Sequence, residues 1–477
     1  MKKIFLILLI LLPSFSFAFE PVPTQTLLLA YLENDLELQN LTLAAQKAEL
    51  ALNYAEVSNG FDISLASGNV TLKADSEGTK ITASPSVKMS LPQASNLSFT
   101  AETDLSLVSE QEASFSDTSL SLGVDIISST ALSRKVTLLK AQRTRTEALR
   151  SLQNRAVEAE SAFYTELKTL LSSIKSIIKA EQTLYSDTID FDSVKAQGYS
   201  SSSSTYRLAQ MQVLSDKHSV ESLLRALLHD YIVFYKKCGY DISLTADQDY
   251  LELIPDDFES AEPVNVLSFE KDSYTKIEAA VWTNQINSME RKTDSVFSLA
   301  ANAGYTFANS STDSDTVDAG LSAVLGGLSL SAGVALPVES DTSPALVLSA
   351  SLSPFSFKKN AIEKKVAALS QEQELLDIES ARSDYETYIV SAIQDLEEIL
   401  WEKESAAENY EMYAKLADEL EDWYKQGIIT ESEYLSARSN AAMYRVEVLI
   451  NMLDVIIYND EVKSNFVSDS VLMEEKA

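Results

Sequence analysis

The feature that most constrains this chain is a helical pattern that runs without interruption from about Lys358 to Gly427. At about 1.5 Å per residue, a helix of roughly 70 residues is ~100 Å long, far beyond the usual helix of a globular protein. Gly427 lacks a Cβ atom and is suited to end this helix, and Thr430 or Ser432 can cap the next one, from Ser432 to about Asn459. The stretch therefore predicts a tight helical hairpin at the end of a long rod.

The same arrangement occurs once more, earlier in the chain. A helical tract from about Leu132 to Gln197 ends at Gly198, and a second helix is expected from about Tyr206 to Lys237. The serine run from Ser200 to Ser204 between them fits a flexible linker, but its position favours a loop at the end of a hairpin. Two such rods indicate two copies of one structural unit.

Between a first predicted helix, from Thr24 to about Asn59, and the first rod, the period of the sequence changes from helical to alternating. From Phe61 to Ile127 apolar residues recur at every second position, in segments of about ten residues that Gly, Asn, Ser and Pro interrupt. This pattern is typical of antiparallel strands, either in a soluble sandwich or in a transmembrane barrel, and the neighbouring features favour the barrel. The apolar positions are Ile81, Ala83, Val87, Met89, Leu91, Leu97, Phe99, Ala101, Leu105, Leu107, Leu120, Leu122, Val124 and Ile126.

The second half of the chain repeats this order. A helix is expected over about Leu267 to Lys292, and strands over Phe297–Phe307, Val317–Leu325, Leu328–Leu336 and Leu346–Leu352. The expected turns are Gly326–Gly327 and Asp341–Pro344, and Ser353-Pro354-Phe355 ends the strands before the long helix. Apolar residues in that helix recur in steps of three and four, which predicts coiled-coil packing, at Ile389, Ile393, Leu396, Leu400, Ala407, Tyr410, Ala414, Ala417 and Tyr424.

The N-terminus has the composition of an export signal, residues 1–18. Lys2 and Lys3 precede an apolar run from Ile4 to Leu12, and Ser16-Phe17-Ala18 fits a cleavage site. The run is shorter than the ~20 residues of a spanning helix, although an uncleaved anchor is the alternative. The mature chain is therefore expected outside the cytoplasm.

Charge and composition exclude several classes of function. The net charge of −33 argues against nucleic acid as a partner. Cys238 is the only cysteine, and His218 and His229 are the only histidines, so no disulfide, metal site or cofactor is expected. The carboxylates are spread along helix faces without a nucleophile or a phosphate-binding loop, so no catalytic residue is predicted and the protein is not expected to be an enzyme.

The predicted boundaries follow from these patterns. The first repeat covers residues 19–238 and the second covers residues 267–460. An acidic connector, residues 239–266 with Asp247, Asp249, Asp256 and Asp257, separates them, and residues 461–477 form a C-terminal tail.

The order of helix, strands, long helix, glycine turn and helix, occurring twice after a signal, resembles the TolC family of outer-membrane efflux proteins. The most specific stretch, Tyr424–Ala437, is similar to that family's tip motif, in which Thr, an acidic position, an apolar pair and Ala follow a Gly. Leu29–Asp35 resembles the opening helix of the family, and Ser353–Phe355 resembles its strand-to-helix corner. The resemblance covers nearly the whole mature chain.

The resemblance implies a mixed α+β membrane protein built from two structural repeats. Three copies share one transmembrane β-barrel in the outer membrane of a Gram-negative-type cell, continued by a helical coiled-coil tunnel in the periplasm. Up to four strands are predicted per repeat, whereas the family has two, so either the hairpins extend beyond the membrane or the barrel is larger than usual.

The resemblance also implies the partners and the function. The protein is expected to be the exit duct of a tripartite efflux or type I secretion system, receiving substrates from an inner-membrane transporter through a periplasmic adaptor (membrane fusion) protein. The adaptor is expected to contact the hairpin ends at Gly198, Tyr199, Gly427, Ile428 and Thr430.

Glu431 and Glu433 are candidates for a pore constriction, because three copies of an acidic tip around one axis form a ring that favours cations. The alternative is a plain solvated tip. Ile429 and Ser436 occupy positions where the family has further charged residues, so a charge-paired latch is not implied.

One alternative of a different class remains open. An exported structural or adhesive protein with a coiled-coil stalk and a soluble β head has the same sequence patterns. It differs from a duct in being soluble without detergent and in having no lipid-facing band on its strands.

Overall fold

The computed structural model describes residues 22–75, 78–108, 114–245, 249–255, 258, 260–295, 297–308, 314–338 and 343–467. The predicted signal peptide, Asp247, Asp256, Asp257, Asp341 and the last ten residues of the predicted tail lie outside this part of the chain.

Contacts divide the chain into two compact units, and each unit is drawn from both halves of the sequence. The helical unit combines Met1–Leu38, Asn154–Val266 and Val390–Ser464. The sheet unit combines Gln39–Gln153, Leu267–Ile389 and Asn465–Ala477. Neither unit therefore corresponds to one of the two predicted repeats.

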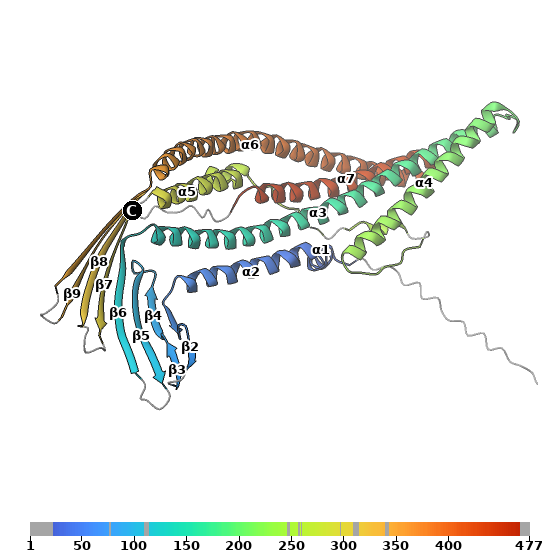
Figure 1. Ribbon diagram of the computed structural model, residues 1–477. Coiled ribbons are helices and arrows are strands. Elements are labelled where there is room, and N and C mark those ends of the chain that lie inside the picture. The colour runs from blue at the N-terminus through green and yellow to red at the C-terminus, as the bar shows by residue number, and fades with distance from the viewer. Residues whose placement is uncertain are drawn as a thin grey trace, which may run out of the picture. The chain divides into compact units, whose positions relative to one another are not determined.

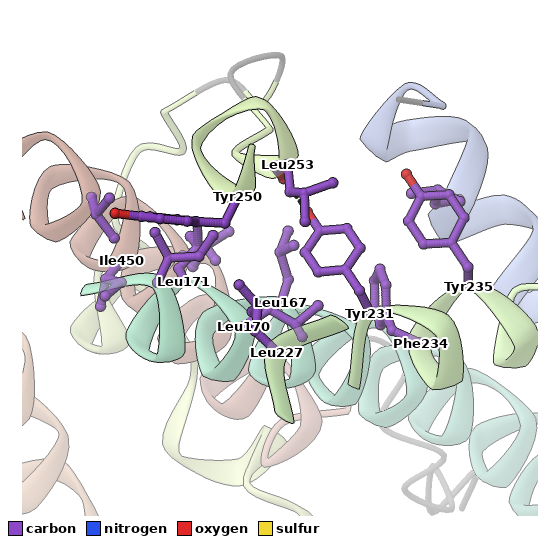
Figure 2. Close-up of a cluster of buried hydrophobic side chains, with 14 of the residues drawn as sticks. Leu167, Leu170, Leu171, Leu227, Tyr231, Phe234, Tyr235, Tyr250, Leu253 and Ile450 are labelled. Carbon is purple, nitrogen blue, oxygen red and sulfur yellow. Dashed lines mark hydrogen bonds between the residues drawn. The ribbon is translucent and has the colours of Figure 1, made fainter. Parts of the chain in front are cut away.

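The helical unit contains α1 (Thr24–Glu33), α4 (Ser204–Lys237), α7 (Glu431–Ser464) and the later parts of α3 (Ser129–Ala196) and α6 (Pro354–Lys425). Figure 2 shows its apolar core, in which leucines of α3 meet aromatic side chains of α4 and a residue of α7. Its labelled members are Leu167, Leu170, Leu171, Leu227, Tyr231, Phe234, Tyr235, Tyr250, Leu253 and Ile450.

The predicted connector contributes to this core. Its short 3₁₀ helix η1 (Tyr250–Leu253) buries Leu253, whose carbonyl accepts a hydrogen bond from the buried Tyr231 hydroxyl. Farther along, the Asn459 amide accepts from the Val264 N–H at 2.7 Å and donates to the Glu262 carbonyl at 2.9 Å. The described part of residues 239–266 is thus fixed to the helices on its way between the two halves.

The first predicted helix is interrupted, contrary to expectation. α1 ends at Glu33, and α2 (Leu36–Ser58) begins after Asp35, whose carboxylate accepts from the N–H groups of Glu37 and Leu38 at 2.7 and 3.0 Å. Arg155 also donates to Asp35, at 2.7 Å. A capping carboxylate held in this way favours a helix start over helix continuation.

The sheet unit contains one sheet of ten strands, all paired antiparallel. Eight strands form a continuous path, β1-β4-β5-β6-β7-β8-β9-β10, in which the pairing of β6 with β7 joins the two halves of the chain. Off this path, β2 pairs with β3, and β3 also pairs with β5. The strands of the first half are β1 (Asp62–Ala66), β2 (Thr71–Asp75), β3 (Gly78–Ala83), β4 (Ser86–Leu91), β5 (Leu97–Val108) and β6 (Ser114–Ile127).

The four strands predicted for the second half are confirmed. They are β7 (Ser298–Phe307), β8 (Thr316–Leu325), β9 (Leu328–Pro337) and β10 (Ala345–Leu352). The helix predicted before them starts later than expected. Two 3₁₀ helices, η2 (Val266–Ser268) and η3 (Lys271–Ser273), precede α5 (Thr275–Ser295).

Buried ion pairs connect α5 to its neighbouring helices. Glu278 of α5 is fully buried and accepts hydrogen bonds from both terminal nitrogens of Arg143 and from Arg150 at 3.0 Å, both on α3. At the other end of α5, Arg291 makes a two-point contact with Glu374 of α6, at 2.7 and 2.9 Å. α5 is thereby clamped to both long helices within the sheet unit.

The C-terminal boundary at residue 460 also differs from expectation. α7 continues to Ser464, and Phe466 is buried, pairs with Tyr274 in an isolated β-bridge and stacks on Phe269 with ring centroids 4.5 Å apart. Residues 461–467 are therefore part of the folded protein.

Candidate functional site: sheet faces and hairpin ends

One face of the sheet is apolar from the first strand of the path to the last. The register aligns one side chain from each strand in rows that cross all eight strands. One such row is Ile63, Met89, Phe99, Leu122, Ala303, Ala319, Val334 and Leu346. A neighbouring row is Leu65, Val87, Ala101, Leu120, Tyr305, Val317 and Leu336.

The opposite face consists mostly of small, hydroxyl and charged side chains, with Val347 of β10 as an apolar exception. A row across the same eight strands is Asp62, Ser90, Ser98, Gly123, Asn302, Gly320, Gly333 and Val347. The next is Ser64, Lys88, Thr100, Ser121, Gly304, Asp318, Ala335 and Ala345. Because side chains alternate between faces along each strand, the two faces differ in chemistry over their whole extent.

The apolar face is exposed. Leu348 of β10 is 69 % exposed, Leu65 of β1 is 78 % exposed, and all described residues of both strands are exposed. Large exposed phenylalanines, Phe61 and Phe355, lie next to the ends of these strands. An exposed apolar surface of this extent marks a surface that contacts another protein or a membrane.

The second hairpin end forms as the sequence predicts. Gly427 has φ of +70°, its N–H donates to the Tyr424 carbonyl, and the Ile428 N–H donates to the Trp423 carbonyl, both at 2.9 Å. This pair of bonds is the Schellman ending of a helix, which satisfies two of its terminal carbonyls. Ile428 is 65 % exposed, so the turn presents an apolar side chain to its surroundings.

Thr430 and Glu433 form a reciprocal cap on α7. The Glu433 carboxylate accepts from the Thr430 N–H at 2.9 Å and from its hydroxyl at 2.8 Å, and the Thr430 hydroxyl accepts from the Glu433 N–H. These hydrogen bonds hold the pKa of Glu433 below its usual value. The capping box gives Glu433 a structural role that the pattern Thr-x-x-Glu signals in the sequence. Glu431 is exposed on the first turn of the same helix.

The first hairpin end has a related geometry. Gly198 has φ of +80°, and its N–H donates to the Lys195 carbonyl at 3.0 Å. After the exposed Tyr199, the Ser203 hydroxyl caps α4 by accepting from the Tyr206 N–H at 3.2 Å. The serine run is therefore the loop of the hairpin.

The two hairpin ends are staggered along the helical unit. Gln182 of α3 donates to the Ser436 hydroxyl of α7 at 3.2 Å, which sets the two helices level at that point. From there α3 continues to Ala196, about 21 Å, whereas α7 reaches its start at Glu431 within about 8 Å. The first hairpin therefore projects about 13 Å farther, so Gly198 and Gly427 are not brought together.

The remaining titratable residues that the sequence singled out are Cys238, His218 and His229. Cys238 is buried, and burial raises its pKa to about 12, so it is a core residue. His218 and His229 are exposed on α4. Among the described residues no group of three His, Cys, Asp or Glu side chains is placed to hold a metal ion. No described helix combines the length and the apolar composition that crossing a membrane requires.

Sequence patterns did not predict the clamp of Arg143, Arg150 and Glu278. The two arginines are seven residues apart, which places them on one helix face. This spacing was the only feature of the local sequence that could indicate a shared carboxylate partner. Their carboxylate partner lies on another helix in the other half of the chain, where no local pattern identifies it.

Two family models match adjoining parts of this chain. The TP096X N-terminal domain matches residues 27–258, and the TP096X C-terminal domain matches residues 259–469. Both domains are matched in this order, and together they cover residues 27–469. No curated protein matches the sequence.

Several solved structures are similar to this chain over most of its length. A membrane protein from Pseudomonas aeruginosa is 12 % identical with a TM-score of 0.47, covering 93 % of this chain and 90 % of that chain. The outer-membrane channel OprN is 12 % identical with a TM-score of 0.47, covering 92 % and 89 %. The MtrE outer-membrane channel of Neisseria gonorrhoeae is 14 % identical with a TM-score of 0.43, covering 92 % and 88 %. All three identities are below 15 % and all three TM-scores are below 0.5, so function has to be argued from the residues of this chain.

Proposed function

We propose that this protein is an outer-membrane exit duct, in which the apolar face of the sheet contacts lipid and the opposite face lines a water-filled passage. The observation that carries the proposal is the set of rows in which the strands of the path present apolar side chains to one face and, apart from Val347 of β10, small or polar ones to the other. Strands β7, β8 and β9 are ten residues long, the length that a tilted strand needs to cross a bilayer.

A homotrimer is part of the proposal. The long helices α3 and α6 then form a coiled-coil tunnel in the periplasm, and the two halves of each chain act as two related repeats around one axis. The exposed edges β1 and β10 support this assembly, because an exposed edge strand in an isolated chain is a site of aggregation that proteins avoid.

The hairpin ends are the proposed contacts for a periplasmic adaptor, itself bound to an inner-membrane transporter of an efflux or type I secretion system. Tyr199 and Ile428 are exposed apolar side chains beside Gly198 and Gly427, whose turns keep them at the ends of the helices. Because the ends are staggered, the adaptor would meet them at two levels.

Glu431 is the better candidate for an acidic constriction. Glu433 is engaged in the helix cap with Thr430, whereas Glu431 is exposed on the first turn of α7 and takes no part in that cap. Three copies of Glu431 near one axis would favour cations over anions.

The alternative, an exported stalk with a soluble β head, is disfavoured by the exposed rows. A soluble head normally buries the apolar face of its sheet against a second layer. Leu346 and Leu348 are more than half exposed in this chain.

Conductance in planar bilayers tests the duct, using full-length protein extracted with detergent. Discrete conductance steps are expected, and Glu431→Gln is expected to reduce the preference for cations. Glu433→Gln is the matched control, because it removes a charge two residues away whose carboxylate faces its own helix. Protein that stays soluble without detergent and gives no conductance would refute the duct and leave the stalk.

A further inference from the structure

We infer that the buried carboxyl group of Asp460 is a proton-dependent anchor near the end of α7, which holds the connector (residues 239–266) when it is protonated and releases it when it is ionised. The inference does not rest on the proposed function, since it concerns contacts inside the helical unit alone. Asp460 is 3 % exposed, and its Oδ2 atom is buried without a hydrogen-bond partner among the described residues. Burying such an oxygen as part of a charged carboxylate is costly, whereas a neutral carboxyl group is tolerated.

Asp460 belongs to a junction in which consecutive buried residues of α7 reach different segments. The Tyr458 hydroxyl donates to the Ala392 carbonyl of α6 at 3.0 Å. The Asn459 side chain holds the connector through its two hydrogen bonds, at 2.7 and 2.9 Å. All three side chains, from Tyr458 to Asp460, are buried. A change in the charge of Asp460 is therefore felt directly beside the contacts that hold the connector.

The junction lies near the positions at which the chain leaves the helical unit. Val264, which Asn459 binds, is two residues before the boundary at Val266. Ala392 is two residues after the boundary at Val390. Loosening the junction would consequently act on the ends of these segments and leave the middle of the helical unit closed.

The charged groups around Asp460 are mostly negative. Glu160 of α3 repels its carboxylate, whereas Lys463, one turn later on α7, attracts it from 3.5 Å but is half exposed. The other two segments of the junction carry further carboxylates, on Glu262 of the connector and on Asp395 of α6. Burial, then the charge of Glu160, raises the pKa of Asp460 to about 6.

Ionisation therefore favours opening of the junction. An exposed aspartate has a pKa of about 4, so the closed junction holds a proton that the open one gives up. The closed state is fully favoured below about pH 4, and this advantage is lost as the pH rises through about 6. Local opening needs less free energy than global unfolding, and it would hydrate the charge while breaking the hydrogen bonds of Asn459.

A metal cation is the competing ligand for the unpartnered oxygen. Within the part of the chain that the structure describes, no group of three His, Cys, Asp or Glu side chains is placed to hold one. Lys463 also places a positive charge beside the carboxylate already. A proton needs neither a third ligand nor space, so the geometry favours it.

Hydrogen exchange followed by mass spectrometry tests the anchor, on the full-length protein from about pH 4 to pH 7. After correction for intrinsic exchange rates, the protection of a peptide containing Val264 is expected to fall by up to about a hundredfold, tenfold for each of the two units between the two pKa values. Asp460→Asn should abolish this fall, because the amide stays neutral. Glu160→Gln should reduce it, because one of the two causes of the raised pKa is removed.

Glu461→Gln is the matched control, because it removes an exposed carboxylate at the next position of α7 and should keep the wild-type profile. A peptide containing Tyr206, at the first hairpin end, is the internal control, because its local opening leaves Asp460 buried. An undiminished fall in Asp460→Asn, or an equal fall in the Tyr206 peptide, would overturn the inference. Protection restored at pH 7 by added Ca²⁺ would also overturn it, in favour of a cation. The duct is tested separately by conductance, so none of these results decides it.

Discussion

Replacing Glu278 with alanine is expected to destabilise the sheet unit strongly. Glu278 is 1 % exposed, and its carboxylate binds Arg143, which is itself 4 % exposed, as well as Arg150. The substitution leaves a buried guanidinium without its principal carboxylate. It also removes the buried ion pairs that connect α5 to α3 and leaves the exposed pair of Lys140 and Glu290.

The expected loss is about 3 kcal/mol of unfolding free energy. Removing one partner of a buried ion pair costs about 3–5 kcal/mol, because the remaining charge stays desolvated. The lower end applies here, since Arg143 keeps a contact to Glu147 at 2.7 Å and lies over the Trp282 ring at 5.0 Å.

The loss should also depend on pH. Burial raises the pKa of Glu278, but its hydrogen bonds to Arg143 and the charges of both arginines outweigh burial, so the pKa is lowered overall. A carboxyl with a lowered pKa in the folded state stabilises the protein at pH values above its unfolded pKa, near 4.3, and loses this effect as the pH falls through the folded value. The gap between wild type and Glu278→Ala is therefore expected to be full at pH 7 and to close in acid.

Urea unfolding followed by tryptophan fluorescence measures the effect, since Trp282 lies beside the clamp. Glu290→Ala is the matched control on the same helix: Glu290 pairs with Lys140 at 2.5 Å, but both side chains are almost half exposed, so the expected loss is below about 1 kcal/mol. Equal losses for the two variants would refute the argument from burial. If Glu278→Ala does not fold, the double variant with Arg143→Met and Glu278→Met should restore folding, because it removes both charges together.

Three further changes have defined expectations. Asp460 is buried with one carboxylate oxygen unpartnered, and burial, then the charge of Glu160, raises its pKa to about 6. The free energy of unfolding is therefore expected to fall by up to about 3 kcal/mol as the pH rises from about 4 to above 6. Asp460→Asn should abolish this pH dependence in urea titrations. Gly427→Ala should cost about 1–2 kcal/mol from the left-handed backbone alone, since a Cβ there meets no atom within 4 Å, and a melting temperature equal to wild type would contradict this. Leu348→Arg should cost about 2–4 kcal/mol of membrane-insertion free energy and so lower the yield of membrane-inserted protein. Ser349→Arg on the opposite face should leave the yield unchanged, and equal yields for the two variants would favour a soluble head.

The elements that the sequence predicted well are those in which one local period decides the structure. β8 and β9 match the expected strands to within a residue, because their alternation is uninterrupted and glycines mark the turn between them. The Gly427 turn was predicted for the same reason, since a left-handed position at a helix end is a local requirement.

Other features depend on partners far along the chain and were not predictable in this way. The pairing of β6 with β7 joins residues about 170 to 190 positions apart, and their alternation fits many possible neighbours equally well. Asp35 interrupts the first helix partly because Arg155 holds it, which no pattern around residue 35 reveals. At the second hairpin end, the pattern around Glu433 fits either a pore-facing carboxylate or a helix cap; the Thr430 contacts show the cap, and the pore stays a prediction.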